Sequence, residues 1–425
     1  MLRRLAAVLA TAIVSVPVVA TPASAATAYC LPVTGSARCH VWTGKVSWVA
    51  DGDTMLVDIN GDGTDTPRPV RIIGMQAMEQ RVYSPNPKKR RGECHALAAT
   101  ARVEQLVKAG GGIVRMTALR ASSKSKGRPL RSISVKINGQ WRDIGADLVS
   151  RGLTLWQPFA GEWAADVTYR KLEAQAASYR RNLFDTDSCG VGPFQSTPLH
   201  VWVNSDADGE DSKNLNGEWV RIGNDSAVNT RIDGWWVRDS GLRRYTFGAN
   251  TVVPAHGAIY LHVGRGHNTP THKYWGLTAP VFENVGAAAH VIGDGAYLFD
   301  RQGDVRSWMQ YPCMLNCTSP LAGKVDVKVH QSGVESIEVT NTSAEAVDLF
   351  GHMLVSKPYR YSFVNHTVLQ PGATLTLYTS WGTSSGLTRY WNKNGGILTD
   401  RGDAVSLQTA AESIVQCVNW GGVRC

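Results

Sequence analysis

The second half of the chain carries one pattern twice, and this repeat limits the folds open to it. "GEWVRIGNDS" (217–226) matches "VESIEVTNTS" (334–343), and the offset from Asn224 to Asn341 is 117 residues. A period this long indicates tandem domains rather than a solenoid. Both copies consist of short alternating segments separated by Gly, Pro, Asn and Asp. The pattern therefore predicts two β-sandwiches.

The first 25 residues are typical of a secretory signal peptide. Arg3 and Arg4 precede the apolar run "LAAVLATAIVSVPVVA", and "ASA" before Ala26 is a small-residue cleavage motif. No later segment is long and apolar enough to span a membrane. We therefore expect a secreted, extracellular protein exported by a bacterial Sec-type signal.

Cysteine usage agrees with export. All eight cysteines follow the signal, and an even number in an exported chain favours disulfides. Eight cysteines allow 105 connectivities, and proximity along the chain favours the pairs Cys30–Cys39, Cys94–Cys189, Cys313–Cys317 and Cys417–Cys425. Zinc at Cys313 and Cys317 is not expected, because no second Cys/His pair stands at ligand spacing.

Positive charge is concentrated in the first half. Residues 26–190 contain 24 Lys/Arg and 15 Asp/Glu, whereas residues 191–425 contain 18 and 20. The excess gathers in "KKRR" (Lys88–Arg91) and "SSKSKGRPLR" (Ser122–Arg131). A solvated basic face would explain it, but a basic domain that also carries a carboxylate turn suits a polyanionic substrate.

The first half has the pattern of a small barrel. Apolar and polar residues alternate on both sides of Asp51-Gly52-Asp53, which predicts two antiparallel strands around a turn. Strands are expected at 46–50, 55–59, 69–75, 112–119 and 131–137. Helical spacing predicts helices from about Glu93, at 143–152 and around 169–179. Many strands with few helices fit a closed barrel with helices packed on it.

Five segments in this half resemble a known family in both content and order. They are "DGDTMLVDI" (51–59), "VRIIGMQAMEQ" (70–80), "SKGRPLRSISV" (125–135), "ADLVSRGLTLW" (146–156) and "RKLEAQAASYRRNLF" (170–184). Together they resemble the staphylococcal-nuclease-like (thermonuclease) domain over about residues 43–190. The combination of DGDT, an Arg-x7-Glu and a later Gly-Arg is specific. The resemblance implies an OB-type five-stranded barrel with three helices.

The resemblance also implies a nuclease activity and its catalytic residues. The family hydrolyses DNA and RNA phosphodiesters with Ca²⁺. Arg71 and Arg128 correspond to two guanidinium groups that clamp the phosphate, and Glu79 to the carboxylate that orients or deprotonates the attacking water. Arg suits this role because its planar fork meets two phosphate oxygens at once. Taken singly, Arg71 or Glu79 could equally be a surface residue.

The metal ligands implied by the resemblance include one departure. Asp53 corresponds to a direct Ca²⁺ ligand and Ala77 to a backbone-carbonyl ligand, while Asp51 lies near the ion. Gln76 stands where most members have Asp, so one oxygen ligand remains but one negative charge is lost. We expect weaker metal binding. A second acidic stretch, Asp58–Asp65, lacks the bidentate Glu of an EF-hand and is expected to form a hairpin tip.

The repeated half resembles a second family. "NLNGEWVRIGN", "IDGWWVRD", "HKYWG" and "GDGAYLFDRQG" are similar to the bacterial lamin-tail domain, an immunoglobulin-like sandwich. We place one such domain at 191–312 and a divergent copy at 313–425. A short disulfide-containing segment at 26–42 is expected to precede the nuclease-like domain. Neither copy contains a catalytic set. The acidic loop Asp206–Asp211 is expected to be solvated.

Two functions follow from this mostly β organisation. The first is a secreted Ca²⁺-dependent nuclease acting on DNA and RNA, attached to a cell surface or a polymer through residues 191–425. The alternative is a non-catalytic nucleic-acid-binding or adhesive extracellular protein with a degenerate nuclease domain. Gln76 supports the alternative, whereas Arg71, Glu79 and Arg128 support the enzyme. The sequence makes no prediction about the oligomeric state.

Overall fold

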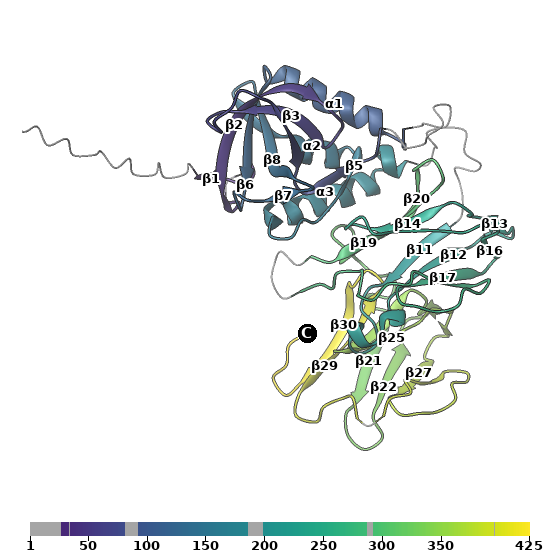
Figure 1. Ribbon diagram of the computed structural model, residues 1–425. Coiled ribbons are helices and arrows are strands. Elements are labelled where there is room, and N and C mark those ends of the chain that lie inside the picture. The colour runs from purple at the N-terminus through teal and green to yellow at the C-terminus, as the bar shows by residue number, and fades with distance from the viewer. Residues whose placement is uncertain (1–26, 34, 81–91, 186–198, 287–291, 395) are drawn as a thin grey trace, which may run out of the picture.

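Three units follow one another along the chain in the computed structural model (Figure 1). The structure describes residues 27–33, 35–80, 92–185, 199–286, 292–394 and 396–425. The predicted signal peptide (1–25) and the basic run Lys88–Arg91 lie outside these residues. Within them, no helix is both long and apolar enough to cross a bilayer.

The first unit is a closed barrel of five strands. The strands, in barrel order, are β2 (Arg38–Val49), β3 (Thr54–Ile59), β4 (Arg68–Ile72), β8 (Arg128–Ile137) and β6 (Ile113–Ala118). Pairing of β2 with β6 closes the ring, and only the β4–β8 pair is parallel. Shorter strands extend the sheet: β1 (Thr27–Tyr29), β7 (Lys124–Ser125) and β9 (Gln140–Asp143). Separately, β5 (Met75–Ala77) pairs with β10 (Thr154–Trp156).

Three helices cover the barrel, as the sequence predicts. They are α1 (Ala96–Ala109), α2 (Ile144–Ser150) and α3 (Asp166–Ser178). The buried face of α1 includes Ala99, Val103 and Leu106, which join the barrel core. Gly52 allows the Asp51–Asp53 turn to lie against this helix, since a Cβ at that position would approach Ala99 Cβ to 2.7 Å.

The predicted disulfides are present wherever both partners are described. Bonds join Cys30 to Cys39, Cys313 to Cys317 and Cys417 to Cys425. Cys94 is also disulfide-bonded, and Cys189, its predicted partner, lies outside the described residues. These bonds are compatible with an extracellular location.

The second and third units are sandwiches with the same ten-strand topology. In the first, one sheet contains β11 (Leu199–Asn204), β12 (Trp219–Asn224), β17 (Ala258–His262) and β18 (His272–Tyr274), and the other contains β15 (Arg244–Thr246), β14 (Trp236–Asp239), β19 (Asp294–Phe299) and β20 (Val305–Tyr311). A small pair joins β13 (Thr230–Arg231) to β16 (Val252–Val253).

The second sandwich repeats this order strand for strand. Its sheets contain β21 (Val325–His330), β22 (Ser336–Asn341), β27 (Thr374–Tyr378) and β28 (Thr388–Tyr390), and β25 (Tyr359–Ser362), β24 (His352–Ser356), β29 (Asp403–Thr409) and β30 (Ile414–Trp420). The pair β23 (Val347–Asp348) and β26 (Val368–Leu369) completes it. The sequence repeat is therefore a structural repeat, and the predicted fold class is confirmed.

A buried asparagine explains part of the repeated sequence. Asn224 accepts from the Ser226 backbone N–H at 3.0 Å and donates to the Val228 carbonyl at 2.8 Å. The equivalent Asn341 makes the same two bonds, to Ser343 at 2.9 Å and to the Glu345 carbonyl at 2.7 Å. The motif is retained because this side chain satisfies backbone groups that the turn leaves without strand partners.

The first sandwich packs tightly against the barrel. Figure 1 shows β14, β19 and β20 on the side that faces the barrel helices. One buried apolar cluster spans the boundary, with Met78, Ala96, Leu155, Ala176, Leu183 and Phe184 from the barrel and Trp236, Tyr297, Phe299 and Val305 from the sandwich. Its rings pack edge to face where Phe184 meets Trp308, at a centroid distance of 4.9 Å.

Polar groups are buried at this boundary as well. Arg170 and Glu173 of α3 have fully buried side chains and form an ion pair at 3.7 Å. Arg170 donates to the Tyr311 carbonyl at 2.9 Å, and the Tyr297 hydroxyl donates to Glu173 at 3.1 Å. Removing one partner would leave buried polar groups without a hydrogen bond, so these bonds hold the two units in one orientation.

The acidic loop of the first sandwich binds the second sandwich, so the prediction of a solvated loop is wrong. Asp206 pairs with Arg360 at 2.7 Å, and Asp208 pairs with Lys393 at 2.6 Å. The Gly209 N–H also donates to the Pro358 carbonyl at 3.1 Å. The loop is charged because it neutralises cations of the following domain, a partner that lies about 150 residues away in sequence.

Candidate active site of the barrel

The seven residues singled out from sequence line one cavity of about 160 Å³. They are Asp51, Asp53, Arg71, Gln76, Ala77, Glu79 and Arg128. The barrel brings them together through strand pairing, since Thr54 of β3 lies opposite Arg71 of β4, and β4 runs parallel to β8, which begins at Arg128. The roles assigned to these residues by resemblance stay predictions.

Asp53 lies at the centre of the polar network and is 3% exposed. One carboxylate oxygen accepts from the Thr54 hydroxyl at 2.8 Å and from Arg71 at 2.9 Å, and the other accepts from the Ala77 N–H at 3.1 Å. Burial raises the pKa of Asp53 to about 6, although the Arg71 guanidinium opposes the shift. Burial disfavours the charged carboxylate unless further positive charge is near.

Gln76 joins the arginine to the loop carbonyl. Its side-chain oxygen accepts from Arg71, while its side-chain N–H₂ donates to the Ala77 carbonyl at 2.7 Å. Arg71 also donates to the Gln157 side chain at 3.2 Å. An aspartate at position 76 could accept from Arg71 but could not donate to Ala77. The departure from the family pattern therefore changes the hydrogen bonding as well as the charge.

Arg128 and Glu79 are the other two charged residues among the seven that line the pocket. Arg128 donates to the Thr54 hydroxyl at 3.2 Å, which places its guanidinium beside the Asp53–Arg71 pair. The Glu79 side chain is exposed at the pocket wall. Its backbone is fixed by Glu93, whose carboxylate accepts from the Glu79 N–H at 2.9 Å. The guanidinium groups of Arg71 and Arg128 and the exposed carboxylate of Glu79 thus line the same small pocket.

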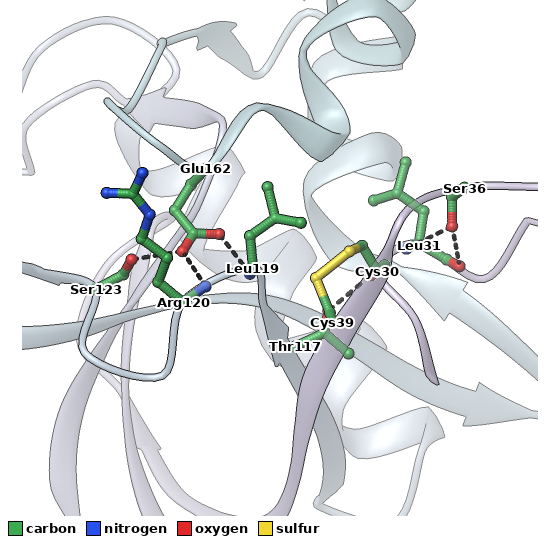
Figure 2. Close-up of a disulfide and its surroundings, with 9 residues drawn as sticks. All are labelled: Cys30, Leu31, Ser36, Cys39, Thr117, Leu119, Arg120, Ser123 and Glu162. Atoms are coloured by element: carbon green, nitrogen blue, oxygen red, sulfur yellow. Dashed lines mark hydrogen bonds between the residues drawn. A yellow bond between two sulfur atoms is a disulfide. The ribbon is translucent and has the colours of Figure 1, made fainter. Parts of the chain in front are cut away.

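A buried carboxylate that the sequence analysis missed supports the basic hairpin. Figure 2 shows Glu162 facing the 119–123 loop. It accepts from the backbone N–H groups of Leu119 and Arg120 at 2.8 and 3.0 Å and from the Ser123 hydroxyl at 2.5 Å. This loop leads into the β7–β8 hairpin that carries Arg128. Glu162 therefore positions Arg128 without lining the pocket.

The N-terminal disulfide fixes the same side of the barrel. Figure 2 shows the Cys30–Cys39 bond beside Thr117. The Thr117 hydroxyl donates to the Cys30 carbonyl at 2.6 Å, so the segment before β2 is tied to β6. The structural role of Glu162 could not be seen in the sequence segment "GEWAAD", because its hydrogen-bond partners are backbone groups some 40 residues away.

The oxygen atoms of the pocket fit a hard cation better than a soft one. The carboxylates of Asp51 and Asp53, the Gln76 amide and the Ala77 carbonyl are all oxygen donors, the type that Ca²⁺ prefers. Among the described residues, no group of three or more His, Cys, Asp or Glu gathers at one point. The Gln76 and Ala77 oxygens also already accept hydrogen bonds within the protein. A cation would compete with these bonds, which fits weak binding.

Three further residues had no role assigned from sequence: Gln157 and Leu242, which line the pocket, and Thr54, which lies beside it. Thr54 and Gln157 are bonded to the charged groups at the centre, and Leu242 comes from the first sandwich. Thr54 lies inside the DGDT motif, but nothing near Gln157 or Leu242 marks them. Their place in the pocket depends on pairing of β5 with β10 and on docking of the sandwich.

A larger cleft of about 690 Å³ lies between the barrel and the first sandwich. Its charged lining contains more acid than base, namely Asp166, Asp239, Glu283 and Asp294 with Arg120 and Arg243. Arg243 is moreover paired with Asp239 at 3.0 Å. A polyanion would be repelled from such a surface, so the smaller pocket is the better candidate for phosphate chemistry.

Fold and site together define a mostly β, three-unit protein: an OB-type barrel with a polar pocket, followed by two immunoglobulin-like sandwiches. The chain belongs to the lamin tail domain family, whose family model (Lamin Tail Domain) matches residues 200–313 and 320–422, slightly more than half of the chain. This match covers the two sandwiches and points to a structural or anchoring role for them. A search among curated proteins found no match.

Proposed function

We propose that the barrel hydrolyses phosphodiester bonds of DNA and RNA and that the sandwiches anchor or position it. The observation that carries the proposal is the pocket itself. Residues from the 51–53 turn, β4, β5, the segment after β5 and β8 line one small space. They supply two guanidinium groups and three carboxylates (Asp51, Asp53 and Glu79), the set that phosphodiester cleavage needs.

The two arginines would bind the phosphate. Arg71 is held in a fixed orientation by Asp53, Gln76 and Gln157, and Arg128 by Thr54. Negative charge grows on the non-bridging oxygens as phosphorus becomes five-coordinate. Donors already oriented toward those oxygens lower the barrier, because they need no rearrangement during the reaction. Arg71 would exchange its Gln157 bond, which is the longest of its three, for the phosphate.

Glu79 would act on the water. Its side chain is exposed to the pocket while its backbone is bonded to Glu93, so the carboxylate can accept a proton from an incoming water molecule. The water oxygen forms the new bond to phosphorus, and the bond to the 5′-oxygen breaks. That oxygen takes a proton from solvent and leaves as a 5′-hydroxyl, while the other product carries a 3′-phosphate. Ca²⁺, when held by Asp51, Asp53, Gln76 and Ala77, would supply positive charge beside the same phosphate.

The test uses residues 26–425 with single-stranded and duplex DNA and with RNA. Cleavage is compared in Ca²⁺, in Mg²⁺ and in chelator, beside the Glu79→Gln variant. Ca²⁺-dependent cleavage that the variant lacks supports the proposal. Cleavage that survives both the chelator and the substitution would show that another site, or a contaminating enzyme, is responsible.

A second candidate function is non-catalytic binding of nucleic acid. One observation favours it: the Arg71 guanidinium already donates to three side chains, which limits how far it can turn toward a phosphate. Under this alternative, wild-type protein binds oligonucleotides in a salt-dependent manner but never cleaves them. The cleavage assay therefore separates the two candidates directly.

A further inference from the structure

We infer that the first lamin-tail sandwich forms one wall of the nuclease pocket and restricts it to single-stranded nucleic acid. The wall is the tip of the β14–β15 hairpin, residues 240–243, with Leu242 lining the same cavity as Arg71 and Glu79. The inference rests on the proposed function, since it names the substrate class of that site.

The apex residue has an unusual backbone and exposure. Leu242 has a φ of 73°, a left-handed conformation that costs a leucine free energy. Its large apolar side chain is also 38% exposed. Strained residues of this kind persist where the surroundings hold them, and they gather at functional sites. A glycine would relieve the strain, so the leucine side chain itself is the feature to explain.

Two buried carboxylates fix the tip. Asp239 is fully buried and accepts from the Arg243 N–H at 2.6 Å, which closes the hairpin. Asp294 accepts from the Ser240 N–H at 2.8 Å. One oxygen of each acid accepts from a backbone N–H of the hairpin, so the tip is held in place although it protrudes. Leu242 is thereby presented to the pocket in one position.

The whole sandwich is also fixed relative to the barrel. The apolar cluster that contains Met78 and Trp236 continues from beneath the pocket into the β14 sheet, and Met78 itself lines the pocket. The bonds from Arg170 to the Tyr311 carbonyl and from Tyr297 to Glu173 cross the same boundary. The tip therefore cannot swing away without exposing this buried surface.

The pocket then lies between two hairpin tips of different character. On the barrel side, Ser125, Lys126 and Arg128 of the β7–β8 hairpin are polar or cationic, whereas Leu242 is apolar. A cationic wall fits phosphates, and an apolar wall fits the face of an unstacked base or its sugar. At about 160 Å³ the space is smaller than pockets that enclose drug-sized ligands, so it suits one phosphate and its immediate neighbours.

A single strand satisfies this geometry better than a duplex. It can bend and unstack so that its phosphate enters the pocket while a base turns toward Leu242. A duplex is stiff over about 150 base pairs, and its bases stay stacked inside. Reaching the same phosphate would require local melting, which costs a few kcal/mol per flipped base.

The second sandwich has an equivalent hairpin, β24–β25, whose tip makes a different contact. By the repeat, Leu242 corresponds to Pro358, in the β24–β25 hairpin. That tip contacts the preceding unit through the Pro358 carbonyl, which accepts from Gly209. The same hairpin thus faces the preceding unit in both copies, but only the first copy places a protruding apolar side chain in a polar pocket.

The test compares Leu242→Gly with Val228→Ala in the full exported chain. Val228 is an exposed apolar residue of the same sandwich, on a different loop, and serves as the matched control. Two readouts are used with one sequence as single strand and as duplex: kcat/KM for cleavage in Ca²⁺, and Kd of a fluorescent oligonucleotide in chelator. Thermal unfolding of each variant confirms that it is folded.

We expect wild type and Val228→Ala to prefer single strands by both readouts. Leu242→Gly should lower the single-strand to duplex ratio by about tenfold, the size expected when one apolar contact is lost. An unchanged single-strand to duplex ratio in Leu242→Gly would overturn the inference that Leu242 selects single strands, while leaving the nuclease proposal intact. A changed binding ratio without any cleavage would support the wall and overturn the nuclease proposal. Binding of neither substrate would overturn both.

Discussion

The guanidinium of Arg71 on β4 lies 2.9 Å from the carboxylate of Asp53, which is 18 positions earlier, in the turn just before β3. Both side chains are almost fully buried, so the pair is shielded from solvent. A phosphate that enters the pocket would offer Arg71 a second anionic partner, and a cation would offer one to Asp53.

Glu79→Gln should abolish most of the cleavage while leaving binding intact. The amide keeps the shape of the side chain but cannot take a proton from water. Loss of a group that acts in the transition state typically costs a factor of about 10²–10³ in kcat. Steady-state cleavage and oligonucleotide Kd are the measurements. Glu104→Gln, an exposed α1 substitution, is the control, and weaker binding by Glu79→Gln would contradict the assigned role.

Gln76→Asp should lower the Ca²⁺ concentration needed for the half-maximal rate. The substitution adds a carboxylate near Asp53 and releases the Ala77 carbonyl from the Gln76 amide. Both changes favour a hard cation. A Ca²⁺ titration of the cleavage rate measures the effect. Gln157→Glu, which adds the same charge without touching Ala77, should shift the titration less; equal shifts would mean that net charge alone decides.

Glu162→Gln should reduce activity through the position of Arg128. The Gln amide cannot accept from the donors of Leu119, Arg120 and Ser123 together, and an unsatisfied buried group costs about 1–3 kcal/mol. We expect kcat/KM to fall and the Ca²⁺ requirement to stay constant, because no proposed cation ligand is touched. If the Ca²⁺ requirement changes instead, Glu162 acts on the cation site. Ser123→Ala, which removes one donor only, should give a smaller loss.

Glu173 should make the stability of the protein depend on pH. Burial raises its pKa from 4.5 to about 7, with Arg170 opposing the shift. The folded state therefore holds a proton between these values that the unfolded state releases, so the free energy of unfolding falls as pH rises from about 4.5 to 7. Glu173→Gln cannot titrate and should flatten this decline, by up to about 3 kcal/mol over the window.

Urea denaturation at several pH values measures this effect. The comparison is between wild type and Glu173→Gln, because other buried acids contribute equally to both. Parallel curves for the two proteins across pH 4.5–7 would show that Glu173 is ionised in the folded state. Glu104→Gln, at an exposed position, should reproduce the wild-type curve.

The sequence predicted the fold well where the pattern was local. Strand alternation, helical spacing and turn residues located the barrel strands, and the 117-residue repeat predicted two sandwiches of one topology. Helix α1 begins at Ala96 rather than at about Glu93. Glu93 instead accepts from the Glu79 backbone, a bond between segments that no local pattern reveals.

The sequence could not predict contacts between the units. The acidic loop containing Asp206 has the composition of a solvated loop, yet it pairs with Arg360 of the following domain. Leu242 gives no signal of its place in the pocket, because a hairpin apex with Gly-Leu is ordinary by composition. Such positions depend on how whole domains dock, and docking depends on surfaces that only the folded units possess.

The hairpins β14–β15 and β24–β25 both contact the preceding unit, but the two sandwiches differ in the loop that can receive such a hairpin. In the first copy, 14 residues separate β11 from β12, and this long connection receives the hairpin of the second copy. In the second copy, only five residues separate β21 from β22, so the acidic receptor loop has no counterpart. The contact between the two sandwiches is therefore asymmetric: the second copy supplies the hairpin, and the first copy supplies the loop that receives it.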